Sequence, residues 1–193
     1  PTFKRSRAHN YIAEEVSAVR KSVGFSEIAN FAKHLITGKN ARSFLNYMLA
    51  GNIPRPGRIS LSPMLSLKGK LIGDLTVACI NEEKFFLYGS GMLQEFHKRW
   101  IEDHLPKNNI EYKNCSDLLH GLAISGPKSR ELLSRVVQED VSDSSLKFRD
   151  TRELFVAGVP CILNRLSFTG ELGYEIYTEP YFLLKLFEEI ENA

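Results

Sequence analysis

Residues 71 to 88 read LIGDLTVACINEEKFFLY, and this stretch decides the fold. Two apolar runs, 71–80 and 85–88, lie on either side of the short polar segment 81–84. Side chains of the first run alternate between two faces, as they do in a β-strand. The polar segment has the length of a hairpin turn. The stretch therefore predicts two antiparallel strands joined by a tight turn.

The register of this hairpin is left open by the sequence. Thr76 and Phe86 share a face only if an odd number of residues separates the paired positions. A two-residue turn at Glu82 and Glu83 places Phe85 beside that face instead. Both alternatives stay open at this point.

Strand-like segments continue on both sides of the hairpin. Ile59, Leu61 and Leu65 alternate with serines, with the period of two that is typical of a strand. Similar apolar runs predict further strands over 25–28, 33–37, 110–113, 119–125, 152–156, 159–168 and 173–177.

Five segments instead show the three- and four-residue spacing of helices. Asn40 is a candidate N-cap for the second of them, and Pro127 a candidate first residue of the fourth. Hairpins mixed with helices indicate an α+β fold of mostly antiparallel sheets with flanking helices, not repeated βαβ units. The predicted helices cover 12–23, 41–50, 93–105, a segment from 127 and a segment after 180.

Length and composition are those of a globular protein. The 193 residues suffice for one sizeable domain or for two small, interleaved ones that share an interface. Hydrophobic residues make up 43% and charged residues 25%. The chain begins without Met and stops inside a helical pattern, so we expect residues 1–193 to be a fragment.

Charge and cysteine content exclude several classes of protein. The net charge is +2, with 25 basic and 23 acidic side chains, which gives no argument for a nucleic-acid partner. No apolar run approaches the roughly 20 residues that span a bilayer, so no membrane partner is expected. The three cysteines are far apart and form no CxxC motif. We therefore expect no zinc site, a reducing compartment and a cytoplasmic location.

Asp74 is the first candidate for chemistry. Aspartate is depleted in strands, yet Asp74 lies in the middle of a predicted one. One interpretation is that its face of the strand meets water. Against this, Ile72, Ala78 and Ile80 share that face and would be exposed as well. A face with apolar ends and a polar middle suits the wall of a cavity better.

Glu175 raises the same question, because it too has apolar neighbours in a predicted strand. It is either an outward-pointing side chain on an edge strand or a buried carboxylate that needs hydrogen-bond donors. A ligand with a guanidine-like N–C–N edge would supply such donors.

Two other features are weaker signals. Gly89-Ser90-Gly91 before a helix is either a tight turn or an anion cradle. His97 and His104 are seven residues apart and lack the i, i+4 spacing of a metal-binding helix, so no metal is expected.

Four segments together resemble the folate-binding domain of the glycine-cleavage T-protein (aminomethyltransferase) family, in the branch fused to dimethylglycine and sarcosine dehydrogenases. No single one of them is specific, but they follow the family's order over essentially the whole chain. Where many members carry two successive aspartates, this chain has Gly73-Asp74, as the dehydrogenase branch tends to. The four segments are 69–77, 89–100, 122–127 and 167–176.

The resemblance implies a cofactor and a site. Tetrahydrofolate is expected to thread a central channel with its pterin buried. The residue matching Asp74 would be catalytic, helping a bound amine nitrogen to lose its proton or stabilising a cationic iminium. The residue matching Glu175 would pair with the amino and ring N–H edge of the pterin. The remaining channel positions are expected at Phe31, Leu61, Thr76, Phe86, Tyr88 and Phe168.

The implied activity is transfer of an aminomethyl or iminium carbon from an amine-derived donor to tetrahydrofolate, giving 5,10-methylene-tetrahydrofolate in glycine, sarcosine or dimethylglycine catabolism. The chain has no flavin-binding fingerprint, so FAD is expected only if an oxidase domain precedes it, and a flavin amine dehydrogenase is a candidate partner. The family's later arginine motif and C-terminal barrel are expected beyond Ala193. Two alternatives remain: a non-catalytic folate-binding module, and a folate-dependent demethylase of a sulfur compound.

Overall fold

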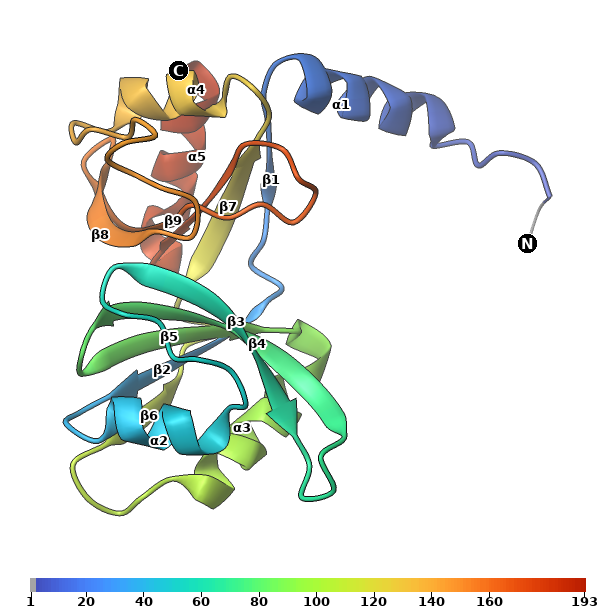
Figure 1. Cartoon of the computed structure of the whole chain (residues 1–193). Helices are drawn as coiled ribbons and strands as arrows, with labels where there is room; N and C mark the ends of the chain where they lie inside the picture. Colours follow the sequence, from blue (N-terminus) through green and yellow to red (C-terminus); the bar gives the residue numbers. More distant parts are fainter. Residues whose placement is uncertain (1–2) are drawn as a thin grey trace.

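The chain folds around two five-stranded sheets, one above the other in Figure 1. The computed structural model describes residues 3–193. All strand pairs are antiparallel, and helices flank the sheets, so the predicted α+β class is confirmed. The α-helices are α1 (His9–Lys21), α2 (Ala41–Met48), α3 (Gln94–His104), α4 (Ser129–Val136) and α5 (Leu183–Asn192). The strands are β1 (Gly24–Glu27), β2 (Ala32–Thr37), β3 (Arg58–Leu65), β4 (Leu71–Asn81), β5 (Lys84–Gly89), β6 (Glu111–Asn114), β7 (His120–Ser125), β8 (Thr151–Val156), β9 (Val159–Asn164) and β10 (Gly173–Thr178).

The chain crosses between the two sheets twice. The upper sheet has the strand order β1-β7-β10-β9-β8, and the lower sheet has the order β3-β4-β5-β2-β6. The lower sheet is therefore a continuous insertion between β1 and β7. Residues 28–31 lead down into it and residues 115–119 lead back up (Figure 1).

Each sheet buries its outer face under helices. In the lower sheet, Val77, Phe85 and Leu87 face the helical side and pack with Phe44 and Leu45 of α2. The upper sheet does the same against α4 and α5, through side chains such as Ile176, Leu133 and Leu186. Burying one such side chain contributes roughly 1.5–3 kcal/mol. Each cluster therefore stabilises its own sheet and the helices packed on it.

The inner faces of the two sheets meet in a third cluster. It joins Ile59, Ala78 and Phe86 of the lower sheet to Ile162 and Tyr177 of the upper one, with further side chains around them. At its centre the rings of Tyr88 and Tyr177 stack, with centroids 4.6 Å apart and planes 25° from parallel. Two ion pairs across the sheets, Arg58–Asp150 and Lys84–Glu153, lie at its edge.

The β4–β5 hairpin resolves the register left open by the sequence. Its turn has two residues, because Asn81 pairs with Lys84. A bulge between Cys79 and Asn81 then shifts the pairing by one residue, so that Thr76 lies opposite Tyr88. Phe86 therefore shares a face with Thr76 in spite of the short turn, since a bulge moves every following side chain to the other face.

Lys33 holds the two crossing segments together. Its side chain is fully buried, and Nζ donates to the carbonyl of Ala29 at 2.5 Å and to that of Ser116 at 3.3 Å. These carbonyls belong to the descending and the ascending segment, respectively. Burial lowers the pKa of Lys33, and the charges of Glu27 and Asp117 oppose that shift.

Some sequence predictions of element ends were wrong. Asn40 stands at the N-cap of α2 but makes no capping hydrogen bond, because its side chain donates to the carbonyl of Asn108. Helix α4 begins at Ser129, since Pro127 and Lys128 form a turn before it. Strand β9 ends at Asn164, and residues 165–172 form a loop instead of continuing the strand.

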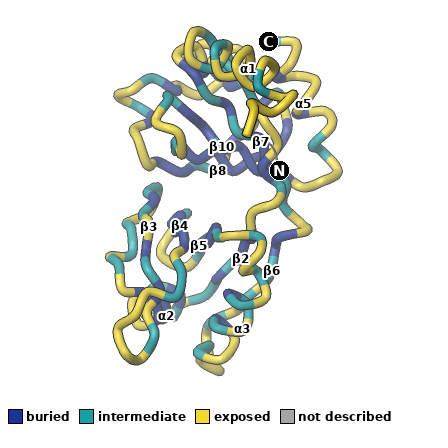
Figure 2. The backbone as a smooth tube through the Cα atoms, turned by 90° about the vertical axis from the view of Figure 1, so that its right-hand side faces the viewer, coloured by how far each residue is buried: buried dark blue, intermediate teal, exposed yellow. Residues whose placement is uncertain are grey.

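Helix α1 was predicted with an apolar stripe, and the helix forms, but the N-terminal part of the stripe is exposed, while Val23 packs against the upper core. Ile12 is 50% and Val16 48% exposed, and α1 projects from the upper half of the chain (Figure 1). Figure 2 shows the same contrast, with exposed backbone along α1 and buried strands inside each sheet. Across residues 3–193, every helix is too short or too polar to cross a bilayer.

A buried histidine makes the lower half sensitive to acid. His34 is fully buried, its Nδ1 lies 2.9 Å from the hydroxyl of Tyr112, and burial together with neighbouring His97 lowers its pKa to about 4. A lowered histidine pKa means that the unfolded chain binds the proton first, so stability is lost as pH falls from about 6.5 to about 4.

We therefore expect His34→Gln to flatten the loss of stability between pH 6.5 and 4, by up to about 3 kcal/mol at the acid end. Urea unfolding at several pH values measures it. His120, a partly exposed residue at the start of β7, provides the control: His120→Gln should leave the acid limb unchanged. An identical acid limb in wild type and His34→Gln would contradict the assignment.

Candidate functional site

Asp74 lies on the inner face of the lower sheet, outside the third cluster. It pairs with Pro63 on β3 and points to the same side of β4 as Thr76 and Ala78. Ala78 is fully buried, Thr76 is half-buried and Asp74 is exposed. The polar middle of this strand thus marks the place where the interface between the sheets opens. Within this chain the carboxylate meets solvent, rather than the water-poor channel that was expected.

Glu175 lies on the inner face of the upper sheet. It is on central strand β10, paired with Ala123 on one side and Asn164 on the other. The hydroxyl of Tyr177 donates to Oε2 of Glu175 at 2.9 Å. Burial raises the pKa of Glu175, and this hydrogen bond opposes the shift. The edge-strand alternative is therefore excluded, and the carboxylate is a partly buried acceptor with one donor.

The Tyr88–Tyr177 stack links the strand that carries Glu175 to the strand that pairs with the one carrying Asp74. Glu175 is two positions before Tyr177 on β10, so the two side chains are neighbours on the inner face. Asp74 is two positions before Thr76 on β4 and so is its neighbour on the inner face. Thr76 in turn lies opposite Tyr88. Register within each sheet, together with the Tyr88–Tyr177 stack between the sheets, therefore places each carboxylate near the margin of this interface, one on each sheet.

Asn164 is a polar residue at this interface that sequence reasoning missed. Asn164, on β9 beside Glu175, is fully buried, and its Oδ1 accepts a hydrogen bond from Thr151 Oγ1 at 2.7 Å. Its amide lies near the Tyr88 hydroxyl and lowers the pKa of Tyr88, against the larger raising effect of burial. Within residues 3–193, neither Asn164 Nδ2 nor the Tyr88 hydroxyl has a well-formed hydrogen bond. The signal available was an asparagine at the end of an apolar strand.

The other predicted channel residues divide into three groups. Tyr88 and Phe86 are buried in the interface. Phe31 and Leu61 are 39% and 65% exposed, and Leu61 lies opposite Thr76 on the inner face of β3. Phe168 is fully exposed in the 165–172 loop, and the structure does not bring it to the two acids. Phe86 also lies away from the acids, near the opposite end of the interface.

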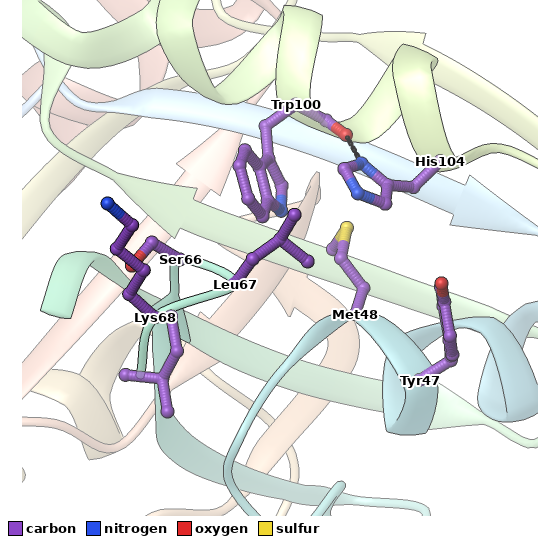
Figure 3. Close-up of a pocket in the computed structure, with 8 residues that line it drawn as sticks. Tyr47, Met48, Ser66, Leu67, Lys68, Trp100 and His104 are labelled. Atoms are coloured by element: carbon purple, nitrogen blue, oxygen red, sulfur yellow. Dashed lines mark hydrogen bonds between the residues drawn. The ribbon is translucent and has the colours of Figure 1, made fainter. Parts of the chain in front are cut away.

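Two grooves lie away from the two acids. The larger, of about 660 Å³, is on the helical side of the lower sheet between α2, α3 and the β3–β4 turn (Figure 3). A second, of about 380 Å³, borders the interface between the sheets at the end away from Glu175, near Phe86 and Thr178. Neither is lined by Asp74 or Glu175. The larger groove is lined by Tyr47, Met48, Leu65, Ser66, Leu67, Lys68, Trp100 and His104.

The weaker sequence signals have structural explanations. Gly91 follows the end of β5 and begins a short 3-10 helix, and a Cβ there would come within 1.8 Å of the Asn30 carbonyl oxygen, so glycine allows the backbone to pass close to the descending crossing. His97 is buried in the lower half, and Nδ1 of His104 lies 2.7 Å from the carbonyl oxygen of Trp100. Residues 3–193 contain no group of three side chains suited to a metal ion.

Comparison with known proteins matches the whole chain, residues 1–193, to the model of the GCVT N-terminal domain. The chain belongs to that family. This confirms the resemblance to the glycine-cleavage T-protein. Human mitochondrial dimethylglycine dehydrogenase is 34% identical over 197 residues, covering all of this chain and 22% of that protein. An aminomethyltransferase of Clostridium botulinum (strain Loch Maree / Type A3) is 30% identical over 181 residues, covering 93% of this chain and 49% of that protein.

Solved structures of GCVT-like proteins share the fold. Aminomethyltransferase T of the glycine cleavage system from Bartonella henselae superposes with a TM-score of 0.80 at 20% identity, over 92% of this chain and 47% of that one. A chain of the heterotetrameric sarcosine oxidase from Corynebacterium sp. U-96 superposes with a TM-score of 0.71 at 17% identity, over 99% of this chain and 94% of that one. The chain thus spans about half of the aminomethyltransferases and under a quarter of dimethylglycine dehydrogenase.

A partly buried carboxylate with one donor has a cost in stability. Because the pKa of Glu175 is raised by burial above its value in the unfolded chain, ionisation costs more in the folded state, and stability is lost as pH rises through that raised pKa. We expect Glu175→Gln to raise the melting temperature at pH 8 by about 2–4 °C, the shift for roughly 1 kcal/mol in a chain of this size.

The gain should shrink as pH falls below that pKa, where wild type is protonated too. Calorimetry at pH 4 to 8 measures it. Glu188→Gln, on an exposed position of α5, is the control and should not change the melting temperature. A Glu175→Gln variant less stable than wild type at pH 8 would show that the carboxylate is well satisfied.

Proposed function

We propose that this chain forms the tetrahydrofolate-binding part of an aminomethyltransferase-like enzyme. In this proposal an amine-derived aminomethyl or iminium carbon is transferred to tetrahydrofolate, giving 5,10-methylene-tetrahydrofolate in the breakdown of glycine, sarcosine or dimethylglycine. The relatives named aminomethyltransferase and dimethylglycine dehydrogenase support the reaction class. A flavin amine dehydrogenase, fused or associated, is the proposed partner, and it would bring FAD. A reducing, cytoplasmic setting is part of the proposal, and all three cysteines are buried thiols.

The residues around Glu175 fit a pterin. Its carboxylate has one donor in residues 3–193, the Tyr177 hydroxyl, and so retains acceptor sites. A pterin carries an amino group and a ring N–H side by side, and a carboxylate accepts from such a pair. Leu61, 65% exposed and opposite Thr76 on the inner face of β3, provides the apolar surface that a fused ring system requires.

Asp74 would accept the proton that an amine nitrogen of the bound folate loses. Bound tetrahydrofolate supplies the amine nitrogens that accept the one-carbon unit. Asp74 is ionisable, lies on the opposite sheet from Glu175 and has no hydrogen bond or ion pair within residues 3–193, so its carboxylate can take a proton from an amine nitrogen. Before that step its negative charge would stabilise a cationic iminium donor.

One observation carries the proposal. In a chain whose full length matches the GCVT N-terminal domain, the two sequence-predicted acids stand at the margin of one interface, one on each sheet. Binding would depend on the partly buried acid, and transfer on the exposed one.

Substitution of each acid in the natural full-length protein should separate the two roles. Asp74→Asn is expected to lower the rate of methylene-tetrahydrofolate formation by about 10²-fold or more, the scale of general acid–base catalysis, and to change the Kd for tetrahydrofolate little. Glu175→Gln should raise that Kd by about tenfold or more, as a hydrogen bond to a charged group is lost.

Anaerobic calorimetry with tetrahydrofolate and a single-turnover assay of methylene-tetrahydrofolate measure the two quantities. Asp103→Asn, an exposed acid of α3, is the control. Wild-type rates in Asp74→Asn would remove Asp74 from the mechanism. Tight folate binding without any transfer by wild type would indicate a non-catalytic folate-binding module, and methyl-tetrahydrofolate as product would indicate a demethylase.

A further inference from the structure

The Tyr177 ring packs against two residues, Gly121 of the neighbouring strand and Tyr88 of the lower sheet. Tyr177 lies opposite Gly121 on β7, and a Cβ on Gly121 would come within 2.7 Å of its Cδ1 atom. The ring therefore lies directly over the glycine. On its other side it stacks on Tyr88 of the lower sheet at 4.6 Å. The side chain is 1% exposed, and it borders the smaller groove.

This packing directs the Tyr177 hydroxyl toward the Glu175 carboxylate. Residues two apart on a strand point to the same side, and a tyrosine that stood upright would carry its hydroxyl past its neighbour's carboxylate. Laid over Gly121, the Tyr177 side chain instead donates to Oε2 at 2.9 Å. A larger residue at position 121 would lift the ring and break that geometry.

The hydrogen bond decides which oxygen of Glu175 is available. Oε2 is held by Tyr177, and Oε1 has no partner within residues 3–193. A fixed carboxylate presents its free oxygen in one direction, so a ligand N–H group meets a preorganised acceptor. The donor also favours the ionised form of a carboxylate that burial pushes toward the neutral form.

We propose that Tyr177, packed between Gly121 and Tyr88, is the positioning residue that orients the Glu175 carboxylate toward the ligand's N–H donors. This inference rests on the proposed function, because it assumes that Glu175 is the group that contacts the pterin edge. It adds two determinants, Tyr177 and Gly121, that lie outside the pair of acids.

The test is Tyr177→Phe in the natural full-length protein, with tetrahydrofolate as the probe in anaerobic calorimetry from pH 5.5 to 8.5. This variant keeps the stacked ring and removes only the donor. We expect about tenfold weaker binding at pH 7.5, the scale of a lost hydrogen bond to a charged group. Without the donor the Glu175 pKa rises further, so the loss of affinity on acidification should begin at a higher pH than in wild type.

Tyr174→Phe is the matched control. Tyr174 is buried on the same strand, but it faces the helical side of the sheet. Its variant should bind within twofold of wild type with an unshifted pH profile. Gly121→Ala is the second test variant, because it displaces the Tyr177 ring while retaining the hydroxyl. It should weaken binding and shift the pH profile in the same direction as Tyr177→Phe.

The failure of this inference differs from failure of the proposed function. If Glu175→Gln loses binding while Tyr177→Phe and Gly121→Ala keep the wild-type affinity and pH profile, Tyr177 has no positioning role. If Glu175→Gln itself binds like wild type, the carboxylate is not in the folate site and the proposed function falls with it. Should Tyr177→Phe fail to fold, the Gly121→Ala profile decides alone.

Discussion

The stack of Tyr88 on Tyr177 is the contact on which the arrangement of this molecule depends. Each sheet has its own core on its helical side, so each half can be stable without the other. One half is fixed against the other by the inner cluster around this ring pair, by backbone hydrogen bonds between residues 57–59 and 149–151, by two ion pairs and by Lys33. Because the candidate site takes one acid from each sheet, the inner cluster sets the geometry of the site as well.

The same interface divides into parts with different physical tasks. Ile59, Ala78 and Ile162 are apolar and buried, and they contribute burial free energy. Toward the margin the side chains become polar, and Glu175 is kept partly buried at a cost in stability. Polar groups that weaken folding are expected where a ligand is to replace water. Exposure therefore rises from Ala78 through Thr76 to Asp74 in step with the change from packing to chemistry.

Much of the fold could be predicted from the sequence, because local patterns determine it. The 71–88 hairpin follows from two apolar runs and a polar turn, and the ten strands and five helices of residues 3–193 lie close to the predicted segments. Boundaries were less predictable where tertiary contacts compete with local signals. Asn40 is a good N-cap by type, but its side chain has a partner on the 105–110 loop. The bulge between Cys79 and Asn81, which decides the faces of β5, leaves no mark in composition.

The candidate site was predictable only in part, and the reason is geometric. Asp74 and Glu175 stand out because a carboxylate in an apolar strand is unusual at the level of single residues. Tyr177 looks like an ordinary core aromatic, and its role depends on which residue lies opposite it on the neighbouring strand. That residue is Gly121, 56 positions earlier in the chain. Cross-strand register of this kind is a property of the assembled sheet, and so is the distinction between a tyrosine that fills space and one that orients an acid.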